Sequence, residues 1–201
     1  MKIIKILVSF LFVMTVFFVN AQNTLWLTNG KKINIGEFKI ENKDFITYKS
    51  LKNKDKSIET YEVFSLIEKD GNEIIVYNQD TTYEGAFSLL EMRAFVQGQT
   101  DASQKFKSPL ITAGGIVLMT ASSVVINPVF VILVSGAYCT TIGLTKPSDK
   151  KLNIPTEYKN NDHYVLGYKK ETKHKRIKNA IIGSGIGLAV GFTTFAIINN
   201  N

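Results

Sequence analysis

The chain has 201 residues and a formal net charge of +7, and its single cysteine excludes an intrachain disulfide. Residues 22–80 carry nine Lys against ten Asp and Glu, a net of −1, and residues 81–108 are balanced at three against three. Residues 146–179 carry nine Lys and one Arg against four acids, a net of +6. Because the excess lies in one segment, the basic composition does not indicate nucleic-acid binding.

Residues 1–21 have the pattern of a secretory signal peptide. Two lysines precede an almost wholly apolar stretch, 3–19, and the small residue Ala21 ends a plausible cleavage site. An uncleaved anchor helix is the alternative, because the apolar stretch is long for a signal peptide. The position of Cys139, far from this junction, excludes a lipoprotein signal. We therefore expect an exported protein whose mature chain begins at Gln22.

Residues 22–80 predict a small antiparallel β barrel. Short runs of alternating apolar and polar residues are separated by turns, among them Asn29-Gly30, the strongest short hairpin signal available. Five or six strands in about 55 residues indicate a strongly bent barrel that buries little surface. Its predicted core is formed by Trp26, Ile33, Ile35, Phe45 and Val63.

This region resembles a known family. The resemblance covers roughly residues 24–78 and rests on Thr28-Asn-Gly-Lys, Phe45-Ile-Thr-Tyr-Lys49, Val63-Phe-Ser-Leu-Ile67 and Asp70-Gly71. The family consists of exported Gram-negative bacterial proteins in which a small β domain precedes glycine-rich membrane segments. The resemblance implies the same fold here, and it carries over no catalytic residue.

Residues 81–108 predict an amphipathic helical connector, since the period of the apolar residues changes from two to that of a helix. Its Phe95-Val-Gln-Gly98 returns as Tyr164-Val-Leu-Gly167 at an offset of 69 residues, and the same offset aligns Gly114 with Gly183. We therefore predict two related units, each an amphipathic lead-in followed by an apolar helix with glycines.

Residues 109–145 contain no Asp, Glu, Lys, Arg or His and predict an apolar helical hairpin. One straight helix of this length would far exceed a hydrocarbon core of about 30 Å. The proline of Asn127-Pro128 divides it into helices at about 110–126 and 129–145. A single span at about 124–145 is the alternative, because it would leave the basic segment in the cytoplasm, as the positive-inside rule prefers.

A basic linker, 146–176, and a glycine-zipper transmembrane helix within 177–201, at about 177–198, complete the predicted domains. Small residues four positions apart allow helix backbones to approach closely in a membrane. The predicted helix-packing residues are Gly183, Gly187, Gly191, Ser135, Cys139 and Gly143.

The basic run predicts contact with anionic lipid headgroups, in the manner of a juxtamembrane anchor, or with another envelope protein. The residues expected to make this contact are Lys169, Lys170, Lys173, Lys175, Arg176 and Lys178.

No catalytic, cofactor or metal site is expected. Gly183-Ser-Gly185-Ile-Gly187 follows a Lys-rich helix and no strand, which argues against a phosphate-binding loop. The two histidines, His163 and His174, lie in the basic segment and do not make a metal site.

The sequence thus predicts an α+β protein with a small β barrel followed by amphipathic and glycine-rich transmembrane helices. The expected function is that of a non-enzymatic cell-envelope membrane protein, with its β domain on the non-cytoplasmic side. Its expected partners are membrane lipid and an envelope protein or a second copy, without nucleic acid. The alternative is an oligomeric membrane assembly or pore built on the glycine zipper.

Overall fold

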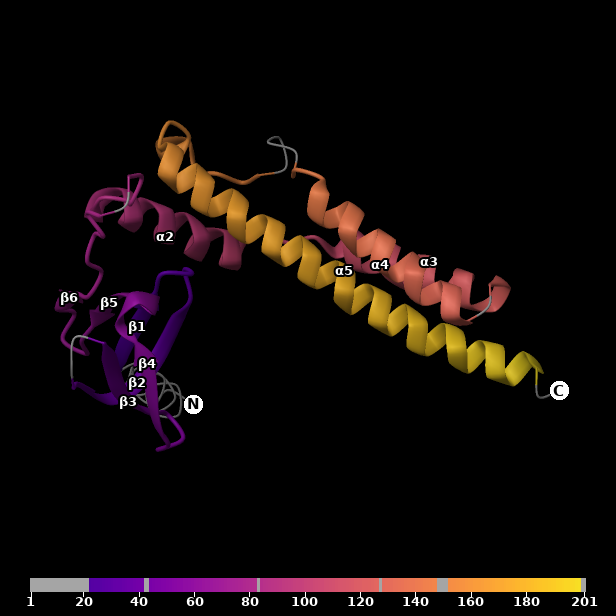
Figure 1. The fold of residues 1–201 in the computed structure, drawn as a ribbon, viewed down its shortest axis with the longest axis horizontal. Helices are drawn as coiled ribbons and strands as arrows, with labels where there is room; N and C mark the ends of the chain where they lie inside the picture. Colours follow the sequence, from indigo (N-terminus) through magenta and orange to yellow (C-terminus); the bar gives the residue numbers. More distant parts are fainter. Residues whose placement is uncertain (1–21, 42–43, 83, 127, 148–151, 200–201) are drawn as a thin grey trace, which may run out of the picture. The chain divides into compact units, whose positions relative to one another are not determined.

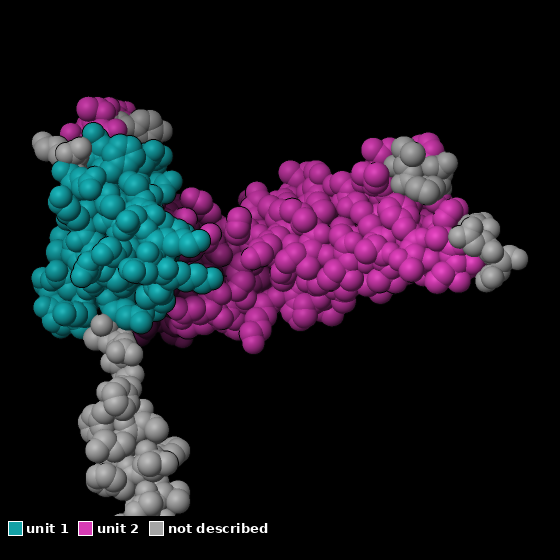
Figure 2. Space-filling model, turned by 90° about the horizontal axis from the view of Figure 1, so that it is seen from below, with its two compact units in different colours: residues 1–27, 32–78 teal, residues 28–31, 79–201 magenta. Residues whose placement is uncertain are grey.

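The computed structural model of the chain describes residues 22–41, 44–82, 84–126, 128–147 and 152–199. The protein is α+β, with an antiparallel sheet followed in the sequence by helices (Figure 1). It divides into two compact units, coloured separately in Figure 2: unit 1 is 1–27 with 32–78, and unit 2 is 28–31 with 79–201. The predicted signal peptide, 1–21, lies outside the described residues, so its cleavage stays a prediction.

The sheet of unit 1 has six strands in the order β4-β3-β2-β1-β5-β6, and all neighbours are antiparallel. The strands are β1 (Asn23–Leu27), β2 (Lys32–Ile40), β3 (Phe45–Ser50), β4 (Asp55–Glu59), β5 (Val63–Ile67) and β6 (Glu73–Ile75). A short 3₁₀ helix, η1 (Thr60–Glu62), joins β4 at one edge to β5, four strand positions away. Four strand spacings in a flat sheet are about 19 Å, whereas a connection of this length spans at most about 14 Å. The sheet is therefore bent.

The sheet does not close, so the predicted β barrel is wrong. Closure requires the two edge strands, β4 and β6, to pair with each other. In the described part of the chain, β6 pairs with β5 alone. β6 has only three residues, and the next two amides, of Val76 and Tyr77, both donate to the carbonyl oxygen of Phe64 on β5. The edge strands β4 and β6 are therefore not paired with each other.

The core of unit 1 lies on one face of the sheet and consists of Leu25, Leu27, Ile35, Ile46, Tyr48, Val63 and Leu66. Trp26 is buried but points to the opposite face, where its ring packs edge-on against Phe64 at a centroid distance of 5.3 Å. The predicted core residue Phe45 is 44% exposed, and its neighbour Ile46 is fully buried. Phe45 shares its face of β3 with Thr47 and Lys49, which explains why the alternation places it outward.

Unit 2 is built from α2 (Leu89–Lys105), α3 (Pro109–Val125), α4 (Pro128–Leu144), η3 (Thr156–Tyr158) and α5 (Asp162–Asn199). Helix α2 begins with a capping box in which Ser88 and Glu91 bond each other's backbone amides. α2 and α3 are bent by 60° relative to each other at the break before Pro109. α3 and α4 correspond to the two predicted arms of the apolar hairpin.

Helix α5 is one continuous helix of 38 residues, about 57 Å long at the standard rise (Figure 1). It begins at Asp162, so about half of the segment predicted as a basic linker, 146–176, belongs to this helix. Lys, Arg and Glu are good helix formers, and α5 contains no proline. The basic residues therefore belong to the same helix as the charge-free segment that follows them.

The Asn29-Gly30 turn belongs by its contacts to unit 2. Gly30 has φ +78°, as the predicted hairpin turn requires. Its carbonyl oxygen accepts a hydrogen bond of 2.7 Å from the Thr100 hydroxyl, and the Gln99 side chain donates to the carbonyl oxygen of Thr28 at 3.1 Å.

The glycines of the internal repeat bring α2 and α5 into backbone contact. A Cβ added to Gly98 would collide with the carbonyl oxygen of Tyr164, and one added to Gly167 would collide with that of Phe95. In each copy, the glycine of the repeat contacts the aromatic residue three positions before the glycine of the other copy. The two helices therefore pack in the register given by the offset of 69 residues. This reciprocity is that of a symmetric parallel helix pair formed within one chain.

Replacing the buried Ile46 with Ala is expected to destabilise unit 1 by about 2–5 kcal/mol, because it leaves a cavity in the core. The matched change Phe45→Ala, at the exposed neighbouring position, is expected to cost less than about 1 kcal/mol. Trp26 is the only tryptophan and is buried in this unit, so urea unfolding of the full chain can be followed by its fluorescence. Equal losses for the two variants would contradict the assigned face of β3.

Candidate functional site

Three glycines of α5 lie against the backbone of α3. A Cβ added to Gly187 would lie 2.6 Å from the carbonyl oxygen of Ile116, and Gly183 approaches the backbone of Thr112 in the same way. Gly191 meets α3 about one turn further along. The contacts advance together along both helices, so α3 and α5 run parallel with almost no side-chain layer between their backbones.

The second predicted stripe lies on α4 and partly faces α5. The Sγ atom of Cys139 is 3.9 Å from the Oγ atom of Ser184, and a Cβ added to Gly143 would lie 3.4 Å from the Cδ1 atom of Ile177. The first contact is a weak hydrogen bond between thiol and hydroxyl, and the second is ordinary van der Waals packing, looser than the contacts of the α3–α5 pair. Ser135, the third member, is half-buried.

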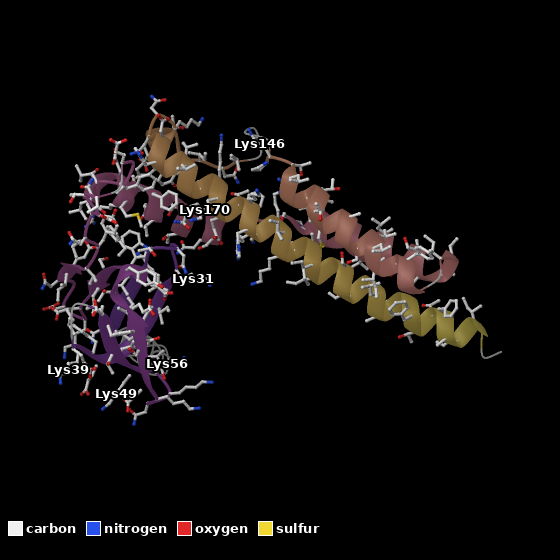
Figure 3. All side chains as sticks on the ribbon, viewed as in Figure 1. Lys31, Lys39, Lys49, Lys56, Lys146 and Lys170 are labelled. Atoms are coloured by element: carbon white, nitrogen blue, oxygen red, sulfur yellow. The ribbon has the colours of Figure 1, made fainter. Side chains whose placement is uncertain are left out.

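Polar contacts align the start of α3, the end of α4 and the middle of α5. The Asn179 amide donates to the Oγ atom of Ser108 at 2.8 Å, and the Arg176 guanidinium donates to the carbonyl oxygen of Thr145 at 2.6 Å. These contacts place the start of α3, the end of α4 and the middle of α5 at one level along the helices. On one side of this level lie the charge-free segments of all three helices. On the other side the cations gather, beginning with Lys146, which Figure 3 labels just beyond α4.

Two of the six cations predicted to contact lipid or a partner are engaged within the chain. The Lys175 ammonium donates to the carbonyl oxygens of Ser103 at 2.5 Å and Phe106 at 2.7 Å, where α2 ends. Arg176 binds Thr145, which follows α4, through both its carbonyl and its hydroxyl oxygen. Carbonyls at a helix C-terminus lack intrahelical partners and carry partial negative charge, so both cations cap helix ends. Lys178 is exposed.

The other three predicted cations, Lys169, Lys170 and Lys173, line a pocket of about 900 Å³ in unit 2, together with Lys146. Most of the remaining lining is apolar and comes from before and within α2, the end of α4 and the first half of α5. These residues are Phe87, Met92, Phe95, Gly143, Leu144, Thr145, Pro147 and Leu166. Sequence reasoning missed the pocket because three separate segments form it. The place of Lys146 directly after a charge-free stretch was the only available signal.

Aromatic rings pack along one wall of this pocket. The Lys170 ammonium lies 5.2 Å from the centroid of the Phe95 ring, and Phe87 packs edge-on against Phe95 at 5.3 Å. His163 in turn packs edge-on against Phe87 at 5.0 Å, and its Nε2 atom is 3.6 Å from a carboxylate oxygen of Glu91. The wall is therefore a packed aromatic layer with one cation on its face.

A polar cluster holds α2 to α5 near the repeated glycines. The Asp101 carboxylate accepts hydrogen bonds from the hydroxyl of Tyr164 at 2.7 Å, from Gln97 at 2.8 Å and from Lys105 at 2.9 Å. Burial by itself would raise the pKa of Asp101, but these donors outweigh burial and hold it below its usual value. Burial and the neighbouring carboxylate raise the pKa of Tyr164. Asp101 is thus an ionised anchor whose donors hold it in place.

The described ranges of the chain contain no group of three or more His, Cys, Asp or Glu side chains placed to hold a metal ion. His174 is exposed. The Gly183-Ser-Gly185-Ile-Gly187 segment lies inside α5 and not at a strand-to-helix turn, so it lacks the geometry of a phosphate-binding loop.

The charge-free part of unit 2 exposes many large apolar side chains. Val117 is 69% exposed, and Val125, at the end of α3, is 85% exposed. Others on α4 and α5 include Phe130, Ile132, Leu133, Leu144, Ile181, Ile182, Ile186, Val190, Ile197 and Ile198. Helix α5 is long and apolar enough to cross a membrane by itself, and α2 with α3 passes the same test as one bent pair. The chain therefore contains a candidate membrane-spanning helix.

Compared with protein-family models, with curated proteins and with solved structures, the chain matches none. The resemblance of residues 24–78 to an exported bacterial family therefore stays a prediction.

Replacing Gly187 with Ala is expected to destabilise the helical unit by about 1–3 kcal/mol, because the new methyl group would overlap the carbonyl oxygen of Ile116. Gly185 is the matched control: it lies on the same helix two positions away, and a Cβ added there would meet nothing within 4 Å. Gly185→Ala should leave stability unchanged or raise it, since Ala favours helix over Gly. Thermal unfolding in detergent, followed by helical circular dichroism, measures both. A stable Gly187→Ala variant would disprove the close α3–α5 packing.

Proposed function

We propose that this is a non-enzymatic membrane protein of the cell envelope, anchored by the charge-free helices of unit 2 and presenting unit 1 to a protein partner. The observation that carries the proposal is the exposed apolar surface of α3, α4 and the second half of α5. Soluble monomers rarely expose contiguous apolar patches of more than a few hundred Å². A surface formed by three neighbouring helices without a charged residue fits contact with lipid tails.

The lengths of these helices support the proposal. α3 and α4 have 17 residues each, about 26 Å at the standard rise. The charge-free part of α5, 179–199, has 21 residues and is about 31 Å long. A hydrocarbon core is about 30 Å thick, so three segments that start or end at one level match its thickness.

The cations at that level support the same placement. Lys and Arg side chains commonly lie at the ends of membrane helices, where their charges reach water and anionic headgroups. Here Lys146, Arg176 and Lys178 lie next to the charge-free segments in the sequence. In this arrangement the chain crosses as the α3–α4 hairpin and then α5, which favours the hairpin over a single span.

The packing of the glycines favours an anchor over a pore. In a pore built on a glycine zipper, the glycine stripe would contact the same helix of other copies. Here Gly183, Gly187 and Gly191 are covered by α3 of their own chain. Intramembrane ionisable residues would support transport, and the charge-free segments contain no Asp, Glu, Lys, Arg or His.

The open side of the sheet supports partner binding by unit 1. A groove of about 510 Å³ lies between η1 and β6, lined by Ile40, Thr60, Tyr61, Ile74, Ile75, Val76, Tyr77 and Asn78. Two of its apolar side chains are conspicuously exposed, Tyr61 at 73% and Ile40 at 48%. An extended segment of another envelope protein would pair with the outer edge of β6 and place its side chains in this groove.

The protein is expected to stay in the membrane fraction when membranes of cells that produce it are extracted with alkaline carbonate. Val117→Lys combined with Ile186→Lys should release much of it, because each central Lys costs about 2.5–3.5 kcal/mol on insertion. Leu51→Lys combined with Tyr61→Lys adds the same charge at exposed positions of unit 1 and should stay in the membrane fraction. Release of the wild-type chain, or full retention of the first double variant, would refute the anchor.

Partner binding and sidedness can be tested together in spheroplasts. A photo-crosslinking residue at Ile75, on β6, should capture a protein, whereas one at Lys54, in the turn before β4, should not. Protease added outside should digest unit 1 without lysis. Protection of unit 1 in intact spheroplasts would reverse the proposed side, and equal capture from both positions would argue against the groove.

A further inference from the structure

We propose that the groove between η1 and β6 binds one extended, unpaired segment of a protein partner, which adds to β6 as a strand. The side chains of the segment that enter the groove are neutral and apolar, and basic residues flank them. The inference rests on the partner binding proposed for unit 1 and names the kind of segment that binds.

The register of β5 and β6 shows which backbone groups face the outer edge of the sheet. The Val76 amide donates to the carbonyl oxygen of Phe64, whereas Ile75 lies opposite Ser65. In an antiparallel pair of strands, hydrogen-bonded residue pairs alternate with pairs that are not hydrogen-bonded. The N–H and C=O groups of Ile75 therefore point away from β5, where an added strand would find one donor and one acceptor.

The two edge strands of the sheet differ in charge. Strand β4 has the sequence Asp-Lys-Ser-Ile-Glu, in which three of five residues are charged. Charged side chains are a common means of preventing a sheet edge from adding another strand. Strand β6 has the sequence Glu-Ile-Ile, and Val76 follows it, so this edge has only one charge. Strand addition is therefore expected at β6.

The groove has room for a segment and not for a second sheet. Thr60 and Tyr61 of η1, with Ile40 at the end of β2, line one side, and β6 with the residues up to Asn78 lines the other. The edge strand of a folded sheet has a neighbouring strand about 4.8 Å away, which would also need space beside β6. A volume of about 510 Å³ is in the range of small ligand sites, so it suits a single extended segment.

The lining of the groove selects neutral, apolar side chains. None of its residues is charged. Ile74 and Val76 also pack against the core of unit 1, so the groove borders that core. Successive side chains of a strand point to opposite faces. Every second side chain of the added segment would therefore face the groove, and these are the positions at which apolar residues are expected.

The rim of the groove selects basic residues on either side. A hydrogen bond with Glu59 and the charge of its carboxylate raise the pKa of Tyr61, so this carboxylate lies beside the lining. The charged residues that directly adjoin the lining residues in the sequence are four acids and one lysine, namely Glu41, Glu59, Glu62, Glu73 and Lys39. Complementary charge around an interface favours the partner that has the opposite sign.

Binding of a fluorescein-labelled synthetic peptide to the full chain in detergent micelles, followed by fluorescence anisotropy, tests the site. The probe peptide alternates Val and Thr and has Lys at both ends. The wild-type chain should bind it. A second peptide, with Glu in place of both Lys, should bind about tenfold more weakly because the rim is acidic. Absence of binding by the lysine peptide, or equal binding of the two peptides, would overturn the proposal.

A proline at the outer edge tests pairing with β6. Ile75→Pro removes an amide that points away from β5, and proline is tolerated at such edge positions. It should weaken binding by about tenfold. Ser57→Pro is the matched control on β4: Ser57 lies opposite Thr47, three positions from the bonded pair of Ser50 and Lys54, so its amide also points outward. This control should bind as the wild type does, and equal losses in both variants would contradict pairing with β6.

Two further measurements do not depend on how well Ile75→Pro folds. Tyr61→Ala should weaken binding, whereas Leu51→Ala removes an exposed apolar side chain outside the groove and should not. Peptides with N-methylated valines or N-methylated threonines each lack the amide donors of one strand edge, and at least one of the two should lose binding. An unaffected Tyr61→Ala variant, or unchanged binding of both methylated peptides, would refute strand addition in this groove.

These outcomes are separate from failure of the proposed function. If a crosslinker at Ile75 captures a protein in cells but the lysine peptide does not bind, the segment proposal fails and partner binding by unit 1 stands. If the peptide binds as expected but alkaline carbonate releases the chain from membranes, the anchor fails and the groove stands.

Discussion

The structure of unit 2 depends on the direct approach of α5 to the backbones of α2 and α3. At Gly98, Gly167 and Gly183 even a methyl group would collide with a carbonyl group of the facing helix. Such closeness multiplies small dispersion contacts, which are the main source of helix association where lipid surrounds the helices. It also requires the helices to stay in one register, because a shift by one residue would bring a bulky side chain into the contact. The remaining features of unit 2 are arranged around this register.

The cations show how the register serves two purposes. Lys175 and Arg176 are consecutive on α5, so they point in different directions and reach the C-terminal ends of two different helices. Each end supplies carbonyl oxygens that would otherwise need water. Lys170 and Lys173, which precede them by two to six residues, do not have this role and line the pocket. The residues of one basic run thus differ in role, as helix caps or pocket lining, because they point from different sides of α5.

Local patterns predicted much of this structure, and the errors concern contacts between distant segments. The Asn29-Gly30 turn and the break near Pro128 depend on a few neighbouring residues, so the sequence suffices for them. The open sheet was missed because closure depends on whether the edge strands β4 and β6 pair, which only the assembled sheet determines. Phe45 was misplaced because both faces of β3 begin with an apolar residue, and only Thr47 shows which face is outside. The pocket could not be predicted because α2, α4 and α5 each supply only part of its lining.

The reciprocal contact between Gly98 with Tyr164 and Gly167 with Phe95 has a consequence for how the helical unit forms. Two separate copies of such a helix would associate only at sufficient density in the membrane, and dilution would separate them. Here both copies belong to one chain, which keeps their effective concentration high at any expression level. Because both copies belong to one chain, they can also differ in structure. The first copy is bent by 60° before Pro109, while the second continues as the single helix α5. The protein thereby combines a dimer-like contact with an asymmetry that symmetric dimers of identical chains lack.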